Sequence, residues 1–188
     1  MRILVLAACW LTALAGEAAA QPVAQQVAVS SCTRTETDGS RALCHEAVLP
    51  ASAHDIWMLF ATSEGLRSWL APVAAIDLRI GGMWEASYDA SARLGDPGNI
   101  RNRIMSYLPE RMLSIQVANA PPGFPHAERV AELWTVIELE PVSAGETRVR
   151  VSMLGYGEGE ADDALWRMFD AGNAYTLQKL GERVGERR

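Results

Sequence analysis

The residues best suited to covalent chemistry are Cys32 and Cys44. Two predicted strands, 27–36 and 40–49, flank Thr37-Asp38-Gly39, and a three-residue hairpin loop with a left-handed glycine places Cys32 opposite Cys44. Directly opposed residues of antiparallel strands have Cα atoms roughly 4.5–5.5 Å apart, within the span of a disulfide. The register therefore predicts a Cys32–Cys44 disulfide.

Metal binding and nucleophilic catalysis have weak candidates. Cys32, Cys44 and His45 lack the ligand spacing of known zinc sites, and the two cysteines do not form a C-x-x-C pair. His45, His54 and His126 fall on a strand, a helix start and a loop, with no spacing that suggests a triad. We therefore predict no metal, no cofactor and no catalytic residue.

Acidic residues gather on one predicted strand. Glu132, Glu138 and Glu140 alternate with an apolar set, so they share a face with Trp134 and should point to solvent. The exposed indole that this alternation implies is unusual. We hypothesise that the disulfide-closed hairpin and residues 21–26 help to cover Trp134.

The N-terminus has the features of a signal peptide. Arg2 precedes an apolar stretch over residues 3–14, and Ala18-Ala19-Ala20 fits a cleavage signal. The stretch is shorter than the about 20 residues of a membrane span. Leu6-Ala7-Ala8-Cys9 has the form of a lipobox, but Cys9 lies too early, inside the apolar stretch. We expect cleavage after Ala20, a periplasmic or secreted protein, and no stable membrane anchor.

Length and charge limit the remaining chain. Residues 21–188 suit one domain, which we divide into an N-terminal extension, 21–41, and a core domain, 42–188. The net charge of −6 argues against nucleic acid as a partner, since such a partner requires a basic patch.

The remaining elements follow from periodicity and end signals. Ser52 and Thr62 fit the N-caps of two short helices, and the second helix runs over residues 63–70. Leu165, Phe169 and other apolar residues spaced three and four apart mark a long final helix. The predicted strands are 73–80, 83–89, 99–107, 112–118, 130–140 and 147–154, and the predicted final helix is 160–184. This order predicts an α+β fold with the final helix on a curved antiparallel sheet.

Several segments resemble the SRPBCC (START-like) superfamily, in the branch related to the activator of heat-shock protein 90 ATPase. The resemblance covers roughly residues 45–184. It is carried, in order, by Trp57, Thr62-Ser63-Glu64-Gly65-Leu66, Trp69-Leu70-Ala71-Pro72, Asp77-Leu78-Arg79-Ile80-Gly81-Gly82-Met83-Trp84, Pro109-Glu110-Arg111-Met112-Leu113, Trp134-Thr135-Val136, Glu138-Leu139-Glu140-Pro141, Gly145-Glu146-Thr147-Arg148-Val149 and Gly155-Tyr156. The exported, cysteine-bearing hairpin departs from this pattern and argues against a cytosolic chaperone role.

The resemblance implies a helix-grip fold with a cavity between the final helix and the sheet. Such a cavity would bind a small apolar or amphipathic molecule. The candidate lining residues are Trp69, Trp84, Tyr88, Asn102, Ile115, Thr135, Met153, Trp166, Phe169 and Asn173. A buried amide must be hydrogen-bonded, so Asn102 and Asn173 either bond internally or orient a ligand. The aromatic residues either line the cavity or fill it.

Two other functions remain open at this point. The first is a metal-independent enzyme like the cyclases and hydrolases of the superfamily, which predicts a carboxylate or histidine inside the cavity. The second is an interaction module of the cell envelope with a packed core and an exposed apolar patch.

Overall fold

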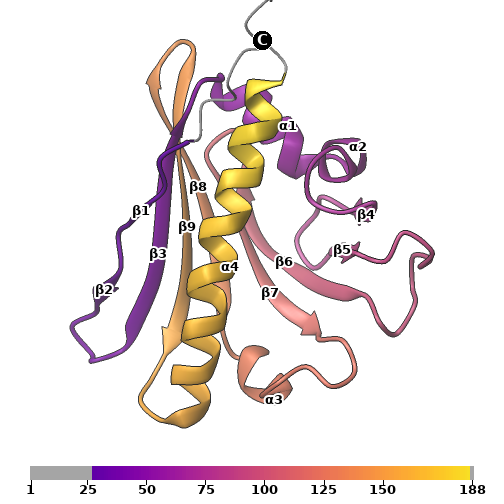
Figure 1. Cartoon of the computed structure of the whole chain (residues 1–188), viewed down its shortest axis with the longest axis vertical. Coiled ribbons are helices and arrows are strands. Elements are labelled where there is room, and N and C mark those ends of the chain that lie inside the picture. Colours follow the sequence, from indigo (N-terminus) through magenta and orange to yellow (C-terminus); the bar gives the residue numbers. More distant parts are fainter. Residues whose placement is uncertain (1–26, 187–188) are drawn as a thin grey trace, which may run out of the picture.

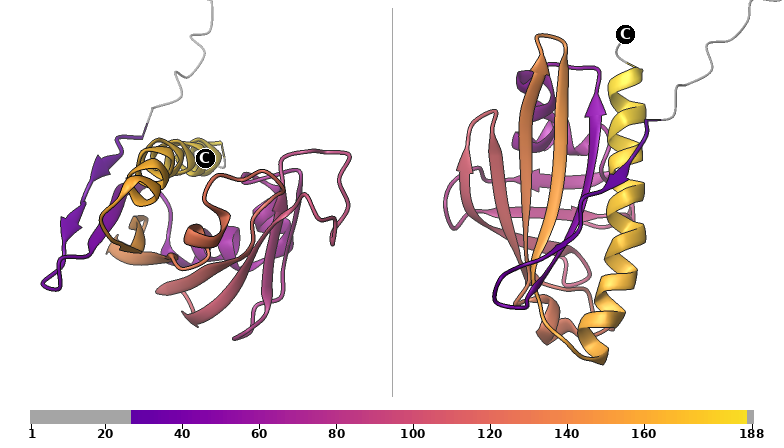
Figure 2. Two further views of the ribbon diagram at one scale, coloured as in Figure 1. Left: turned by 90° about the horizontal axis from the view of Figure 1, so that it is seen from below. Right: turned by 90° about the vertical axis from the view of Figure 1, so that its left-hand side faces the viewer.

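A curved antiparallel sheet wraps around one long helix in the computed structural model, which describes residues 27–186 (Figure 1). The elements are β1 (Ser30–Ser31), β2 (Arg34–Thr35), β3 (Arg41–Leu49), α1 (Ala53–Ala61), α2 (Ser63–Arg67), β4 (Val73–Ile76), β5 (Met83–Ser87), β6 (Ile100–Leu108), β7 (Met112–Asn119), α3 (Ala127–Val130), β8 (Trp134–Ser143), β9 (Glu146–Tyr156) and α4 (Glu160–Gly185). The sheet order is β1-β3-β9-β8-β7-β6-β5-β4, with β2 also paired to β3. Seen from below, the sheet curves around α4, as the predicted helix-grip fold requires (Figure 2).

The N-terminal hairpin confirms the predicted disulfide. Cys32 and Cys44 are bonded, with Cα atoms 4.8 Å apart, and Gly39 has the left-handed φ of +86° that the loop needs. The predicted strand 27–36 is nevertheless interrupted between β1 and β2. The Thr33 hydroxyl accepts a hydrogen bond from the Cys44 backbone N–H at 3.2 Å, so a side chain replaces one bond of the backbone ladder.

The two predicted helix caps are confirmed. Ser52 Oγ accepts from the Asp55 backbone N–H at 3.1 Å, and Thr62 Oγ1 accepts from the Gly65 backbone N–H at 2.9 Å. The second helix ends at Arg67, three residues earlier than predicted. Pro72 follows closely, and residues before a proline disfavour the helical conformation.

The predicted strand 73–80 ends at Ile76, because the next six residues close a tight turn. Gly81 has a φ of +79°, and a Cβ on Gly82 would lie 2.1 Å from the Asp77 carbonyl oxygen. The glycine pair therefore determines where β4 stops.

The start of the predicted strand 130–140 is wrong, because α3 occupies Ala127–Val130 and β8 begins at Trp134. Arg129 fixes this helical turn. Its guanidinium donates to both carboxylate oxygens of Asp162 in α4, at 2.7 and 3.1 Å, and to the Gly155 carbonyl oxygen. These partners lie 26 and 33 residues away, so local periodicity does not reveal them.

The core divides into two clusters on the concave side of the sheet. The larger cluster packs α1, α2 and one end of α4 against the sheet. The smaller cluster lies near α3 and consists of Leu43, Val130, Leu133, Met153, Tyr156 and Leu165. Both clusters contribute side chains to the space under α4.

The faces of β8 agree with the predicted alternation. Leu133, Ile137 and Leu139 are buried, whereas Trp134 is 43% exposed on the opposite face. One strand, β9, lies between β8 and β3, the inner strand of the disulfide-closed hairpin. Residues 21–26, expected to cover Trp134, and the predicted signal peptide, 1–20, lie outside the described residues. Within residues 27–186, no helix is long and apolar enough to cross a membrane.

Candidate functional site

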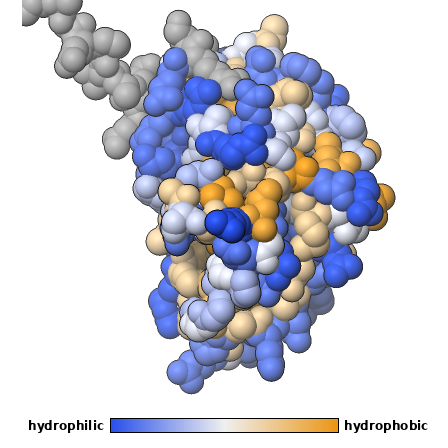
Figure 3. Space-filling view, turned by 90° about the vertical axis from the view of Figure 1, so that its right-hand side faces the viewer, coloured by the Kyte–Doolittle hydropathy of each residue, from blue (hydrophilic) through white to orange (hydrophobic). Residues whose placement is uncertain are grey.

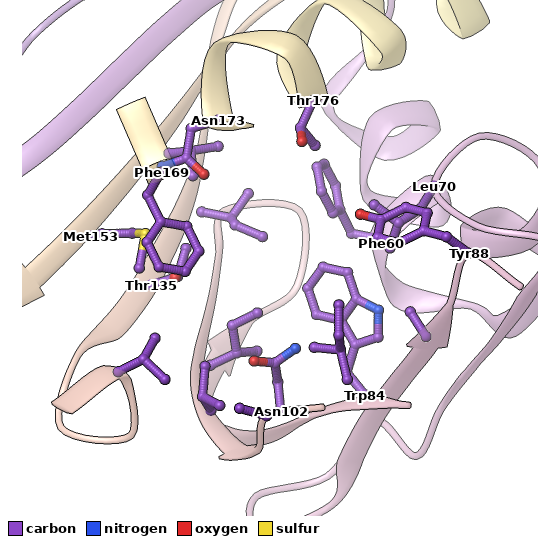
Figure 4. Close-up of a pocket in the computed structure, with 18 of the residues that line it drawn as sticks. Phe60, Leu70, Trp84, Tyr88, Asn102, Thr135, Met153, Phe169, Asn173 and Thr176 are labelled. Carbon is purple, nitrogen blue, oxygen red and sulfur yellow. The ribbon is translucent and has the colours of Figure 1, made fainter. Parts of the chain in front are cut away.

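A cavity of about 220 Å³ lies between α4 and the concave face of the sheet (Figure 4). Strands β5 to β9 form its floor, α4 its roof, and α1 and the segment before β8 its ends. Alternation positions the floor, because every second residue of a strand points to the concave face. Phe169, Asn173, Thr176, Leu177 and Leu180 form the roof at the three- and four-residue spacing of one helical face.

Nine of the ten predicted residues line this cavity. They are Trp69, Trp84, Tyr88, Asn102, Ile115, Thr135, Met153, Phe169 and Asn173. Figure 4 shows side chains from α1, α4 and the strands converging on one space. The tryptophans therefore line the cavity without filling it.

Trp166 is the exception, and its predicted place in the lining is wrong. Its ring packs edge-on against Tyr156, with centroids 5.1 Å apart, and the Arg41 guanidinium lies 4.9 Å from its centroid. Trp166 shares a face of α4 with Asn173 and Leu177, seven and eleven positions on, but it lies near the start of the helix. There it packs on the smaller core cluster, so tertiary packing and not helical phase keeps it out of the lining.

Sequence reasoning missed part of the lining. Phe60 of α1, and Pro121 and Phe124 of the loop after β7, line the cavity, but no local sequence signal marks them as lining residues. Val130 of α3 also lines the cavity. No local pattern brings this loop under α4, because Arg129–Asp162 and the other contacts that hold it are long-range.

The polar side chains that face the cavity are largely unpaired. Within the described chain, the Asn102 amide, the Thr135 hydroxyl and the Asn173 amide make no hydrogen bond, and the buried Nδ2 of Asn173 and Nε1 of Trp84 have no acceptor. By contrast, Trp69 Nε1 donates to the Leu59 carbonyl oxygen at 3.1 Å. Burying a polar group without a hydrogen-bond partner costs free energy, so a bound molecule or water is expected to pair with these groups.

Among residues 27–186, no Asp, Glu, His, Lys or Arg lines the cavity. Its one titratable side chain is Tyr88, which lies at the edge of the cavity and is 68% exposed overall. Partial desolvation by the surrounding protein raises the pKa of its phenol above the ordinary value. Tyr88 is therefore neutral at physiological pH, and the cavity holds no charge.

A groove of about 230 Å³ adjoins the cavity beside α4. The two share Trp69, Leu70, Tyr88 and Thr176 as lining residues, while Tyr175 and Lys179 belong to the groove alone. The space-filling view from the β4–β5 side shows apolar side chains gathered near the middle of that face, surrounded by polar ones (Figure 3).

The histidines and carboxylates lie elsewhere. His45 binds Asp170 at 3.2 Å, and His54 binds Glu110 at 2.7 Å. Glu138 and Glu140 face outward beside arginines of β9. In residues 27–186 no group of three or more His, Cys, Asp or Glu side chains is arranged to hold a metal ion.

Solved structures with this fold differ widely from the chain in sequence. The Aha1 dimer from Colwellia psychrerythraea aligns with a TM-score of 0.62 at 17% identity, over 77% of this chain and 96% of that one. CalU16 from Micromonospora echinospora aligns with a TM-score of 0.59 at 18% identity, over 84% and 86%. Norcoclaurine synthase from Thalictrum flavum, in complex with dopamine and hydroxybenzaldehyde, aligns with a TM-score of 0.53 at 14% identity, over 84% and 87%.

The family of the chain follows from its sequence and not from these distant likenesses of fold. No curated protein matches the chain significantly. The model of the family described as "activator of Hsp90 ATPase homolog 1-like protein" matches residues 50–185. That range contains the caps, the glycine turn and the last hairpin on which the resemblance rested. The chain therefore belongs to the activator of Hsp90 ATPase homolog 1-like family of the SRPBCC superfamily.

Proposed function

We propose that this protein binds a small, mainly apolar molecule in the cavity under α4. One observation carries the proposal: the cavity has an apolar, charge-free lining in which several polar groups lack a partner. Ligand sites typically combine an apolar lining with a few polar groups that fix orientation. A volume of about 220 Å³ is below the roughly 300–1,000 Å³ of drug-sized pockets, so a compact molecule is expected.

Binding is favoured over catalysis by the same lining. An enzyme working by acid–base chemistry would place a carboxylate or histidine in the cavity with a perturbed pKa. The lining has neither. The likeness to norcoclaurine synthase is a likeness of fold at 14% identity, and it supports a ligand-sized cavity without supplying a reaction.

Export to the periplasm or the medium is part of the proposal. The Cys32–Cys44 disulfide suits an oxidising compartment. The intact mass of the protein secreted by its native host tests this: a chain that begins at Gln21 and is two hydrogens lighter than its reduced form is expected. A full-length chain whose three cysteines, Cys9, Cys32 and Cys44, are all reduced would refute export.

Binding is tested with N-phenyl-1-naphthylamine, an uncharged dye that fluoresces when it enters apolar sites. We expect saturable binding to the purified protein, displaced by lipid extracts, and native mass spectrometry should detect any molecule that copurifies. Met153→Trp fills the cavity from β9 and should weaken dye binding at least tenfold. Met105→Trp is the matched control, because Met105 is 42% exposed and does not line the cavity.

Circular dichroism checks that both variants fold. If Met153→Trp does not fold, Ile115→Phe adds less volume to the same floor and serves in its place. Equal dye affinity in the cavity variant and the control would overturn the proposal. So would the absence of saturable binding to the wild-type protein.

A further inference from the structure

The polar groups of the cavity are divided between two places. Trp84 and Asn102 are paired across β5 and β6, and their side chains lie together at one side (Figure 4). Asn173 of α4 and Thr135 of β8 lie at the other side, beside Phe169 and Met153 (Figure 4). Apolar floor residues, among them Ile115, line the cavity with them. A bound molecule can thus meet an amide at either end.

The chemistry of these groups specifies what they need. An indole N–H only donates, and an amide NH₂ offers two donors. Trp84 is 6% exposed and its Nε1 lacks an acceptor, as does Nδ2 of Asn173, whereas nothing in the lining is a carboxylate. Within the described chain, the two buried lining atoms that lack a partner, Trp84 Nε1 and Asn173 Nδ2, are therefore both N–H donors. The group that complements them is an oxygen acceptor on the ligand.

The charge of that acceptor is limited by the surroundings. No Lys, Arg or His of the described chain lines the cavity, so a carboxylate or sulfonate inside it would have no counter-ion there. The described lining likewise has no Asp or Glu to pair with an ammonium group. Burying an unpaired ion in an apolar site is strongly unfavourable.

We propose that the ligand is an uncharged, compact hydrocarbon skeleton bearing a carbonyl, ether or hydroxyl oxygen, and that Asn102 and Asn173 select it through that oxygen. This inference rests on the proposed binding function, which supplies the site but does not specify the polar group. The two amides then act as specificity-determining residues, because they distinguish an oxygenated molecule from a hydrocarbon of the same shape.

Three naphthalenes of nearly equal size test the proposal: 2-acetylnaphthalene, 2-ethylnaphthalene and 2-naphthoate. Their affinities are measured by displacement of N-phenyl-1-naphthylamine. A neutral hydrogen bond should make the acetyl compound on the order of fivefold tighter than the ethyl compound. The anionic naphthoate should bind at least a hundredfold more weakly than the acetyl compound.

Substitutions test whether the amides of Asn102 and Asn173 cause the preference for the acetyl compound. In the Asn102→Leu/Asn173→Leu double variant, the preference for the acetyl over the ethyl compound should fall to about twofold or less, because leucine keeps the volume and removes both amide NH₂ groups. The indole N–H of Trp84 remains as a single donor at one side of the cavity. Gln178→Leu is the matched control, since Gln178 lies on the exposed side of α4, and it should keep the wild-type preference. Should the double variant not fold, the two single variants replace it, and the naphthoate comparison requires no variant.

The outcomes separate the two proposals. If the dye binds nowhere saturably, the proposed function fails. If both neutral compounds bind but the wild-type protein prefers the ethyl compound, binds naphthoate equally well, or keeps its preference in the double variant, only this inference is overturned.

Discussion

The two faces of strands β8 and β9 share one backbone but have opposite chemistry. On the concave face Ile137 and Val149 are at most 4% exposed, and Thr135 and Met153 line the cavity. On the convex face Glu140 meets Arg148 at 2.9 Å, and Glu138 lies 3.8 Å from Arg150.

The difference shows how the cavity stays free of charge. These strands are rich in ionic residues, but strict alternation turns each of them outward. Near α3, Arg129 and Asp162 form an ion pair and neutralise each other. A charge is therefore tolerated on the concave side only when it has a partner.

An unpaired charge on the concave face should unfold the protein. Val149→Asp buries a carboxylate at a position that is 0% exposed, and we expect it to lower the free energy of unfolding by about 4 kcal/mol or more. Val48→Asp is the matched control, because Val48 is 43% exposed and pairs across the sheet with Arg148. It should change stability by about 0.5 kcal/mol or less in urea titrations. Similar losses at both positions would contradict the comparison.

Breaking the Arg129–Asp162 pair should have the next largest effect. Asp162 is only 6% exposed, and Arg129→Ala removes its guanidinium partner. We expect this variant to lower the free energy of unfolding by about 2–4 kcal/mol. The Arg129→Ala/Asp162→Asn double variant should recover part of that loss, because it removes the stranded charge. Urea unfolding of the three proteins measures this. A double variant less stable than Arg129→Ala would show that the unpaired charge of Asp162 does not cause the loss of stability.

Pairs on the convex face should contribute little. Arg150 binds Glu46 at 2.9 Å, with about a third of its side chain exposed. Arg150→Met should cost at most about 1 kcal/mol, and the difference from the wild-type protein should shrink in 0.5 M salt because exposed pairs are screened. A salt-independent decrease of more than about 2 kcal/mol in the free energy of unfolding would show that this pair behaves as a buried ion pair and would contradict the prediction.

The smallest effect concerns pH. The Glu110 carboxylate accepts a hydrogen bond from His54 at 2.7 Å and raises the pKa of His54 above its ordinary value of 6.5. A raised pKa in the folded state stabilises the protein fully below pH 6.5, and this contribution disappears as the pH rises through the raised value. The melting temperature of His54→Gln relative to wild type, followed from pH 5 to 9, should show a small deficit only at the acidic end. A deficit that grows toward pH 9 would have the wrong sign.

Sequence patterns with short-range causes determined much of this protein. The cap at Ser52, the turn at Gly81–Gly82 and the hairpin register that joins Cys32 to Cys44 all depend on residues a few positions apart. The order of the predicted elements indicated an α+β fold, and the resemblance to the SRPBCC superfamily implied the helix-grip cavity, nine of whose ten predicted residues line it.

Contacts between residues far apart in the sequence determined the features that local patterns did not predict. It placed Phe124 under α4, made residues 127–130 helical and turned Trp166 onto Tyr156. The partners of Arg129 are 26 and 33 residues away, and the position of α4 depends on packing against the whole sheet. Whether tryptophans fill or line a cavity depends on the volume left between packed elements, and no sequence period encodes that volume.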